Sequence, residues 1–355
     1  MIRVGLVGFG LGGRVLHAPV IASVEGLTLA AVLERSTNNA AARYPGITTY
    51  RSLDAMLADE SLGLIVLTTP TGTHFELARQ ILVADKNLVI DKPMCTTSAQ
   101  VAELMQLAQE KNLLLAPYHN RHWDSDFRTV EKLLHEKTLG RIVGFESTMD
   151  RWKPGTTRAA WKDDSATGGG LLLDLGSHLA YLALTLFGLP LAVGAEVGRE
   201  RAGQGSDDAF TLRLRYPDQI TTLAANNLAA TPRPRFSLRG TEGGFVQYSV
   251  DPQEAALNQI VRIEDSNWGQ VPESDWGMLT LDRAGQLVSS PLASEPGDYR
   301  IFYAGIRDAL LGTAPAPVSA LEAWRTVRVL EYALESAQQR REIPCDWSQE
   351  PVVSA

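Results

Sequence analysis

The first third of the chain alternates short apolar runs with stretches of helical spacing. Apolar runs typical of buried strands occupy residues 2–7, 27–33, 64–68, 88–90 and 113–117. Between them, apolar residues recur at helical spacing, which predicts helices at 14–24, 53–58, 75–84 and 98–111. Strands that alternate with helices indicate a parallel sheet with right-handed crossovers, so this part is expected to be an α/β domain.

After residue 117 the pattern changes to a helix followed by strand-like alternation. The helix is expected at about 125–136, and a second one runs from the glycines at 168–170 to about residue 187. Alternating runs lie at 143–149, 192–200, 209–216, 220–226, 235–239 and 245–250. Because turns join many of these neighbours, we expect an α+β domain with an open, largely antiparallel sheet. The tail from Glu342 is expected to be poorly ordered.

A glycine-rich stretch follows the first apolar run directly. Gly8, Gly10 and Gly13 fit the spacing G-x-G-x-x-G, with a strand predicted before them and a helix after them. In that context one glycine allows a tight turn, one lets the backbone approach a pyrophosphate, and one allows close helix–strand packing. The sequence therefore predicts a Rossmann NAD(P)-binding domain over residues 1–119 and a substrate-binding and oligomerisation domain over 120–345.

Ligands of parallel sheets bind beyond the carboxyl ends of the strands. Predicted strands end next to Gly8, Glu34, Thr69, Asp91 and Tyr118, so these positions are expected at one edge of the sheet. The predicted cofactor-binding residues are Gly8, Phe9, Gly10, Gly12, Gly13, Glu34, Arg35, Ser36, Thr69, Pro70, Thr71, His74, Asp91, Lys92, Pro93 and Asn120. His74 has two interpretations, a contact with the cofactor or a helix cap.

The end of the second strand carries conflicting signals for the type of nicotinamide dinucleotide. A carboxylate at Glu34 suits the ribose hydroxyls of NAD and repels a 2′-phosphate. Arg35, Ser36 and Thr37 offer a guanidinium and two hydroxyls, which suit the 2′-phosphate of NADP. If the Glu34 side chain turns into the ribose, NAD is favoured, and if it turns away, NADP is favoured. We favour NADP, because Arg35, Ser36 and Thr37 form the fuller site.

Two short motifs carry residues suited to acid–base chemistry. Lys92 stands at the mouth of a buried strand, between Asp91 and Pro93, and either takes part in proton transfer or caps the strand as an ion pair. In the second half, Asp174 and His178 follow three glycines and lie four residues apart, so they share one helical face.

Together these motifs resemble the glucose–fructose oxidoreductase/inositol dehydrogenase/MocA family over nearly the whole chain. The most specific likeness is Asp91-Lys92-Pro93, most often Glu-Lys-Pro in that family, combined with Gly-Gly-Gly-x-Leu-x-Asp-x-Gly-x-His at 168–178. The stretches 118–127 and 251–254 are similar to scyllo-inositol dehydrogenase-like members. The resemblance implies a Rossmann domain, an open-sheet domain, a nicotinamide cofactor and hydride transfer at a sugar or polyol carbon.

The resemblance also implies a catalytic trio, Lys92, Asp174 and His178, matched residue by residue. Either His178 or Lys92 is the general base for the carbinol proton, with the other residue orienting or stabilising the substrate oxygen. Two positions depart from the family pattern. Asp91 is a shortened carboxylate, and Tyr181 stands where the family's His-x-x-Asp ending has an acid.

A stretch dense in polar and aromatic groups follows the last predicted Rossmann strand. Such groups suit a polyol, which needs donors, acceptors and an apolar face, although packing between the domains is the alternative interpretation. Arg151 and Trp161 either close the pocket from the second domain or pack at the surface. The predicted substrate-binding residues are Lys92, Tyr118, Asn120, Arg121, Trp123, Arg151, Trp161, Asp174 and His178.

Composition narrows the functional classes further. A formal net charge of −8 over 355 residues argues against a nucleic-acid surface. The two cysteines, Cys95 and Cys345, form no disulfide framework or zinc-ligand cluster, and no metal site is expected. No apolar run reaches membrane-span length, and the N-terminus resembles no signal peptide, so we expect a cytoplasmic enzyme.

Two functional classes fit these observations. The first is an NAD(P)-dependent dehydrogenase of a sugar or polyol, and the second is a catalytically silent ligand sensor on the same fold. Retention of the whole trio favours the enzyme. Alternation along 210–214 suggests one packed and one pairing face of the second sheet, which together with the resemblance predicts a homodimer or homotetramer.

Overall fold

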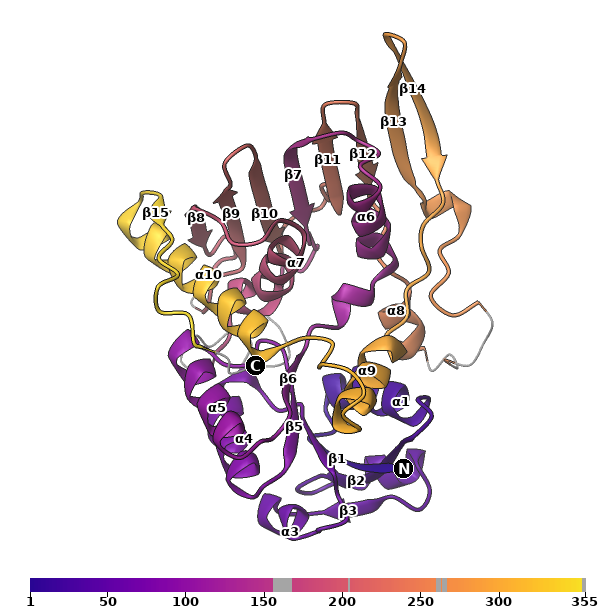
Figure 1. The fold of residues 1–355 in the computed structure, drawn as a ribbon, viewed down its shortest axis with the longest axis vertical. Helices are drawn as coiled ribbons and strands as arrows, with labels where there is room; N and C mark the ends of the chain where they lie inside the picture. The colour runs from indigo at the N-terminus through magenta and orange to yellow at the C-terminus, as the bar shows by residue number, and fades with distance from the viewer. Residues whose placement is uncertain (156–167, 204, 260–262, 264–266, 353–355) are drawn as a thin grey trace.

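The structure is a computed structural model that describes residues 1–155, 168–203, 205–259, 263 and 267–352. Two sheets form its framework, a parallel one near the N-terminus and a larger one above it in Figure 1. Trp161 and the other residues of 156–167 lie outside the described residues. The arrangement confirms the predicted fold class, a Rossmann-type α/β half followed by an α+β half with a mostly antiparallel sheet.

The first sheet has six parallel strands in the order β3-β2-β1-β4-β5-β6. Its strands are β1 (Ile2–Val7), β2 (Leu27–Leu33), β3 (Thr48–Tyr50), β4 (Leu64–Leu67), β5 (Asn87–Asp91) and β6 (Leu115–Tyr118). Alternate residues of the central strands enter two separate apolar cores, with Leu64 and Val66 on one side and Ile65 and Leu67 on the other. Burial of both faces explains the continuous apolar runs in the sequence.

Helices connect the strands of this sheet. They are the π-helical turn η1 (Gly12–His17), α1 (Ala18–Ala22), α2 (Asn39–Arg43), α3 (Leu53–Leu57), the 3-10 turn η2 (Thr71–Thr73), α4 (His74–Val83) and α5 (Ser98–Glu110). The helix predicted at 14–24 therefore begins earlier, at Gly12, and its first turn is wider than an α-helix. Strand β3 was not predicted, because it has three residues and two of them are threonines.

The second sheet has nine strands in the order β14-β13-β12-β11-β7-β10-β9-β8-β15. The strands are β7 (Ile142–Thr148), β8 (Ala192–Gly198), β9 (Ala209–Arg215), β10 (Ile220–Asn226), β11 (Phe236–Gly240), β12 (Gly243–Gln247), β13 (Gly277–Arg283), β14 (Gln286–Leu292) and β15 (Ile343–Pro344). Neighbouring strands are antiparallel except for β7 and β10, which are parallel. Strands β13 and β14 project as a hairpin (Figure 1), and β14 is exposed over all but its last residue.

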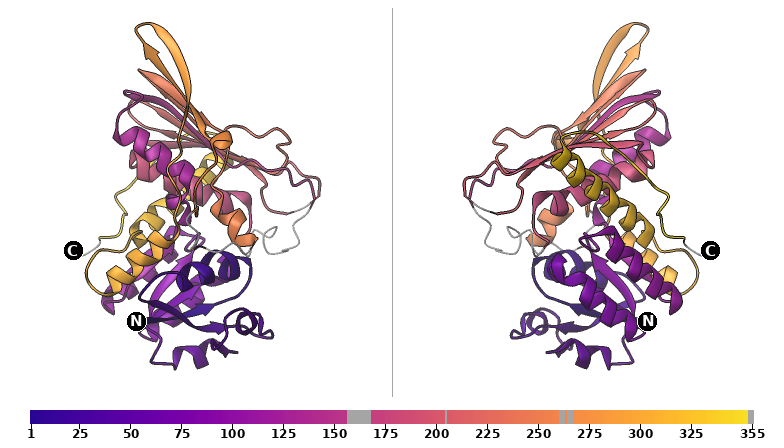
Figure 2. Two further views of the ribbon diagram at one scale, coloured as in Figure 1. Left: turned by 90° about the vertical axis from the view of Figure 1, so that its right-hand side faces the viewer. Right: turned by 90° about the vertical axis from the view of Figure 1, so that its left-hand side faces the viewer.

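Helices α6 (Ser125–His135), α7 (Ser177–Phe187) and α10 (Ala320–Gln339) lie on one face of this sheet (Figure 2). Phe145, Leu212, Leu223 and Phe236 belong to the buried core on that side. No helix of the described residues covers the opposite, outer face. Shorter elements complete the chain, namely η3 (Asn120–Trp123), η6 (Leu172–Gly176), α8 (Gln253–Asn258), η7 (Glu273–Asp275) and α9 (Arg300–Leu310).

Helix α10 joins the two halves, and the described chain after it, up to Val352, packs against the rest of the molecule. Glu331 of α10 accepts hydrogen bonds from the backbone N–H and hydroxyl of Ser98, both at 2.7 Å, and so caps α5. The prediction of a poorly ordered tail from Glu342 is wrong. Strand β15 pairs with β8, and the indole of Trp347 donates to the Pro190 carbonyl at 3.1 Å.

Candidate active site

The glycine loop has the geometry that a dinucleotide requires. Gly8 has a φ of 99°, which favours glycine, and a Cβ on Gly13 would lie 2.3 Å from the Gly8 carbonyl oxygen. A Cβ on Gly10 would meet nothing within 4 Å, so the backbone is open to a ligand there. These residues fit a pyrophosphate placed against the loop at the end of β1.

Glu34 does not point toward a ribose, which corrects the prediction that its side chain binds the cofactor. Its carboxylate accepts hydrogen bonds from the Thr37 hydroxyl at 2.5 Å and from the backbone N–H groups of Asn39 and Ala40. The residue is only 6% exposed. Glu34 therefore caps the start of α2, where backbone donors and the helix dipole favour a negative charge.

The loop after Glu34 presents positive charge instead. Arg35 and Ser36 are exposed. Arg51, which was not predicted, donates to the carbonyl oxygens of Glu34 and Thr37 and to the Asn38 side chain. The Arg51 guanidinium thus holds this loop in place, while the Arg35 guanidinium stays exposed at the end of β2.

Lys92 and Asp174 are joined directly across the two halves of the chain. The Lys92 ammonium donates to the Asp174 carboxylate at 2.9 Å and to the Asp174 backbone carbonyl at 2.6 Å. Its side chain is 13% exposed. An ammonium has three N–H groups, so one remains for a ligand after these two bonds. The end of β5 and the turn η6 therefore hold the Lys92 ammonium with one N–H group available to a ligand.

Asp91, predicted to bind the cofactor, supports Lys92 from behind. Its carboxylate accepts from the Lys92 backbone N–H at 2.8 Å and lies 3.7 Å from His17 Nε2. Burial raises the pKa of Asp91, but the nearby His17 imidazole and the Lys92 ammonium outweigh burial and lower it. A Cβ on Gly12 would lie 2.9 Å from this carboxylate, so the glycine loop packs against it.

His178 lies one helical turn after Asp174 and is 4% exposed. Its Nδ1 is buried and has no hydrogen-bond partner among the described residues. Burial, followed by the positive charges of Lys92 and Arg121, holds the pKa of His178 well below its ordinary value. The imidazole is therefore neutral near pH 7 and able to accept a proton.

Two aromatic residues beside His178 were missed as site residues. The rings of Tyr181 and His119 stack at 4.1 Å and 9°, and the Tyr181 hydroxyl lies 2.7 Å from His122 Nδ1. Burial and the Lys92 charge lower the pKa of His119 to about 3. Tyr181 stands where the family pattern has an acid, and no local spacing in the sequence joins position 119 to position 181.

Tyr118 and Trp123 belong to the core, so their assignment to the substrate pocket is wrong. Tyr118 is fully buried, and its hydroxyl donates to the Leu16 carbonyl at 2.9 Å. The ring of Trp123 packs edge-on against Phe302 with centroids 5.6 Å apart. Both rings pack beneath α9, a helix that the sequence pattern did not predict.

His74 joins two loops instead of facing the cofactor or capping a helix. Its Nε2 lies 2.7 Å from the Thr69 carbonyl oxygen and its Nδ1 lies 3.0 Å from that of Pro93. Burial lowers the pKa of His74. Thr71 is buried, and a Cβ on Gly168 would lie 3.4 Å from its Cβ, so the second half contacts this loop.

The remaining predicted substrate residues are Asn120, Arg121, Arg151 and Trp161, and their positions differ. Asn120 is buried at the end of β6, and Arg121 donates to Asp124 at 3.0 Å and to Glu254 at 2.8 Å. Arg151 lies close enough to Asp174 for their charges to interact. Trp161 lies outside the described residues. Lys92, Asp174, His178, Arg121 and Arg151 thus meet between the two sheets.

The described part of the chain contains no group of three or more His, Cys, Asp or Glu side chains that could hold a metal ion. No helix within it is both long and apolar enough to cross a bilayer. The groups that meet beside the open glycine loop are the Lys92 ammonium, the Asp174 carboxylate and the His178 imidazole.

Comparison with known proteins agrees with this geometry. Residues 2–119 match an oxidoreductase family model described as an NAD-binding Rossmann fold, and residues 131–345 match its C-terminal alpha/beta domain. The uncharacterized oxidoreductase YdgJ of Escherichia coli is 38% identical over 96% of this chain and 97% of its own. The scyllo-inositol 2-dehydrogenase (NADP(+)) IolW of Bacillus subtilis is 33% identical over 96% of this chain and 95% of its own.

Solved structures show the same fold over almost the full length. The Bacillus subtilis oxidoreductase yvaA superposes with a TM-score of 0.93 at 32% identity, covering 98% of this chain and 99% of that one. An oxidoreductase from Yersinia pestis gives a TM-score of 0.91 at 39% identity, covering 97% of each chain. Both halves of the molecule are therefore shared with these proteins.

Proposed function

The chain belongs to the GFO/IDH/MocA oxidoreductase family, and from that premise we propose that it transfers a hydride between a nicotinamide dinucleotide and a sugar or polyol. The observation that carries the proposal is the contact of Lys92 with Asp174 beside a neutral, buried His178. A similar protein, IolW, is named as a scyllo-inositol 2-dehydrogenase, which supports a polyol as the substrate class.

In the proposed mechanism, a carbinol carbon loses a hydride while its hydroxyl loses a proton. A bound nicotinamide dinucleotide supplies the acceptor for the hydride, or its donor in the reverse direction. His178 accepts the hydroxyl proton, because its lowered pKa leaves the imidazole in the deprotonated form that a base requires. The remaining N–H of Lys92 holds the substrate oxygen and stabilises the negative charge that develops on it. Asp174 accepts hydrogen bonds from the other two N–H groups of Lys92 and so fixes the direction of the third.

This assignment makes His178 the general base and Lys92 the oxygen ligand. The alternative, with Lys92 as the base, would use a group that already donates two hydrogen bonds to Asp174. His178 has a buried Nδ1 without a partner among the described residues, and its positively charged neighbours favour its neutral form. The surroundings of both groups support His178 as the base.

We propose NADP as the preferred cofactor. Glu34 turns away from the position expected for the ribose, and its carboxylate accepts hydrogen bonds from Thr37 and from the start of α2. Arg35 and Ser36 remain exposed at the end of β2, where a 2′-phosphate would lie. IolW, named for its use of NADP(+), supports the same choice.

Replacing Arg35 with alanine tests the cofactor proposal. NADP binding should weaken by about 1.5–3 kcal/mol, the contribution of a charged hydrogen bond, while NAD binding changes little. Titration of both dinucleotides by calorimetry measures the two effects. Equal losses for NAD and NADP would mean that Arg35 only stacks on the adenine, and NADP preference would then need another cause.

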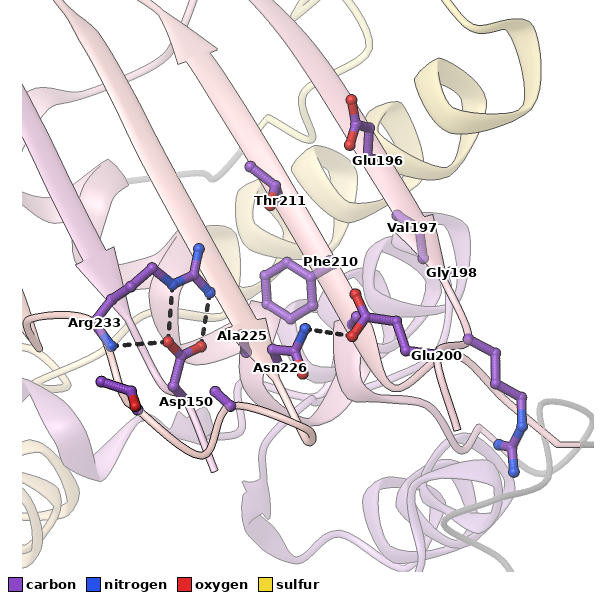
Figure 3. Close-up of a pocket in the computed structure, with 14 residues that line it drawn as sticks. Asp150, Glu196, Val197, Gly198, Glu200, Phe210, Thr211, Ala225, Asn226 and Arg233 are labelled. Atoms are coloured by element: carbon purple, nitrogen blue, oxygen red, sulfur yellow. Dashed lines mark hydrogen bonds and ion pairs between the residues drawn. The ribbon is translucent and has the colours of Figure 1, made fainter. Parts of the chain in front are cut away.

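We also propose that the chain assembles into a homodimer or homotetramer through the outer face of the nine-stranded sheet. Thr211 and Arg213 point to that face from β9, while Phe210 and Leu212, which alternate with them, are buried. The face contains a hollow of about 560 Å³ that the paired side chains of Asp150 and Arg233 border (Figure 3). Light scattering should give a multiple of the 38.6 kDa chain mass. A monomer mass at every concentration would contradict assembly.

The experiment for the proposed function is a substrate screen. The protein is mixed with NADP or NAD and with each of a set of inositols, aldoses and sugar acids, and absorbance of the reduced nicotinamide is followed. Turnover of at least one carbinol substrate supports the dehydrogenase. Tight dinucleotide and polyol binding with no turnover of any member would instead support a ligand sensor.

A further inference from the structure

The backbone of Arg151 is held in place just beyond the end of β7 in the nine-stranded sheet. It follows β7 by three residues, donates from its backbone N–H to the Asn226 carbonyl at 2.8 Å, and accepts from Ala229 N–H at 3.1 Å. Its neighbour Asp150 points to the outer face, where it pairs with Arg233 (Figure 3). Side chains alternate along extended backbone, so Arg151 points to the inner side, where Asp174 lies.

The guanidinium of Arg151 is half-buried and has no hydrogen bond or ion pair with any residue that the structure describes. The charged groups whose fields reach it are Asp174, Arg121 and Glu254. Burial lowers the pKa of Arg151, and the charges of Asp174 and Glu254 only partly oppose that effect. A guanidinium withdrawn from water without a bonded partner is costly, so its position favours an anion brought by a ligand.

Arg121 provides the contrast within the same site. It donates to Asp124 at 3.0 Å and to Glu254 at 2.8 Å, so its charge is already compensated. Lys92 is likewise compensated by Asp174 at 2.9 Å. Of these three cations, Arg151 alone has no carboxylate bonded to it among the described residues.

We propose that Arg151 binds a carboxylate on the substrate, so that the polyol or sugar taken by this site is an acid, such as a uronate or an aldonate. The inference rests on the proposed function, because it extends the polyol site with an anion-binding group. The planar fork of an arginine matches both oxygens of a carboxylate. One uncompensated positive charge suits a singly charged carboxylate better than a doubly charged phosphate.

Binding measurements test this inference separately from turnover. The NADP-loaded protein is titrated by calorimetry with D-glucuronate and D-glucose, D-galacturonate and D-galactose, and D-gluconate and D-glucitol, with D-glucose 6-phosphate as a phosphate probe. At least one acid should bind about 10- to 100-fold more tightly than its neutral partner, the value of a charged hydrogen-bonded pair. The R151M variant should lose that preference while neutral binding persists, and R151K should keep part of it.

The control variant is R141M, which removes the same charge from an exposed position. It should keep the acid preference of the unaltered protein. Absence of preference for any acid, or a preference that survives R151M, would overturn the inference, and stronger binding of the phosphate than of every carboxylate would overturn the choice of anion. An acid preference without turnover contradicts the dehydrogenase alone, and turnover without an acid preference contradicts this inference alone.

Discussion

Replacing Lys92 with alanine is expected to lower kcat at least about 100-fold, the scale of a lost oxyanion or acid–base contact. The variant removes the one N–H that Asp174 leaves available for the substrate oxygen. Dinucleotide binding should persist, because the glycine loop and the Arg35 loop hold most of the cofactor. Steady-state kinetics on a substrate found in the screen, with calorimetric titration of the dinucleotide, measures both effects.

Two comparisons make this result specific to Lys92. Lys92→Arg keeps the positive charge but changes the donor geometry, so it should recover only part of the activity. Lys132→Ala, at an exposed surface pair with Glu295, should keep full activity. Near-normal turnover by Lys92→Ala on the same substrate would contradict the proposed role.

His178→Asn is expected to reduce kcat by about 100-fold or more, because it removes the proposed proton acceptor. The unaltered protein should show an unusual pH dependence as well. A base works in its deprotonated form, and the pKa of His178 is well below its ordinary value, so kcat should stay constant as pH falls through about 6.5. Activity should fall only at a more acidic pH, where the imidazole finally gains a proton.

The pH profile separates this role from a structural one. His135→Asn, at an exposed position on α6, should leave both kcat and the profile unchanged. In His178→Asn, the acidic limb due to this group should disappear along with most of the rate. An acidic limb at the ordinary imidazole pKa in the unaltered protein would contradict the neutral, buried base.

The parallel strands of the first sheet and the glycine loop follow from patterns within the sequence, whereas the meeting of Lys92 with Asp174 follows from the family resemblance. Buried parallel strands give uninterrupted apolar runs, and the carboxyl ends of β1, β4 and β5 lie at one edge by topology. Asp174 and Lys92 are 82 residues apart, and the family likeness was what joined them. Their contact at 2.9 Å agrees with that likeness.

Side-chain directions could not be predicted in the same way. Glu34 occupies the expected end of β2, but three donors at the start of α2 draw its carboxylate away from the ribose. Tyr118 and Trp123 lie in a stretch that is polar on average, yet α9 packs over both rings. Such contacts depend on an element almost two hundred residues later, which no local pattern contains.

Exposure and length explain the elements that were missed. Strands β13 and β14 form a projecting hairpin, and β14 is exposed over all but its last residue, so its sequence lacks the alternation of a half-buried strand. The tail after α10 is anchored by Trp347 and by a pair between Arg325 and Glu350 at 2.6 Å. One aromatic residue in a polar stretch, such as Trp347, does not produce a recognisable sequence pattern, although it anchors the tail in the structure.

The measurement that tests the central claim most directly follows a deuterium atom. The substrate identified in the screen is prepared with deuterium on its reacting carbinol carbon, and the dinucleotide is recovered after turnover and analysed by mass spectrometry. The account predicts that the reduced dinucleotide carries the deuterium, and that Lys92→Ala forms this product at least about 100-fold more slowly while still binding NADP. A reduced dinucleotide without deuterium, or equal rates from both proteins, would contradict hydride transfer at the Lys92–Asp174–His178 site.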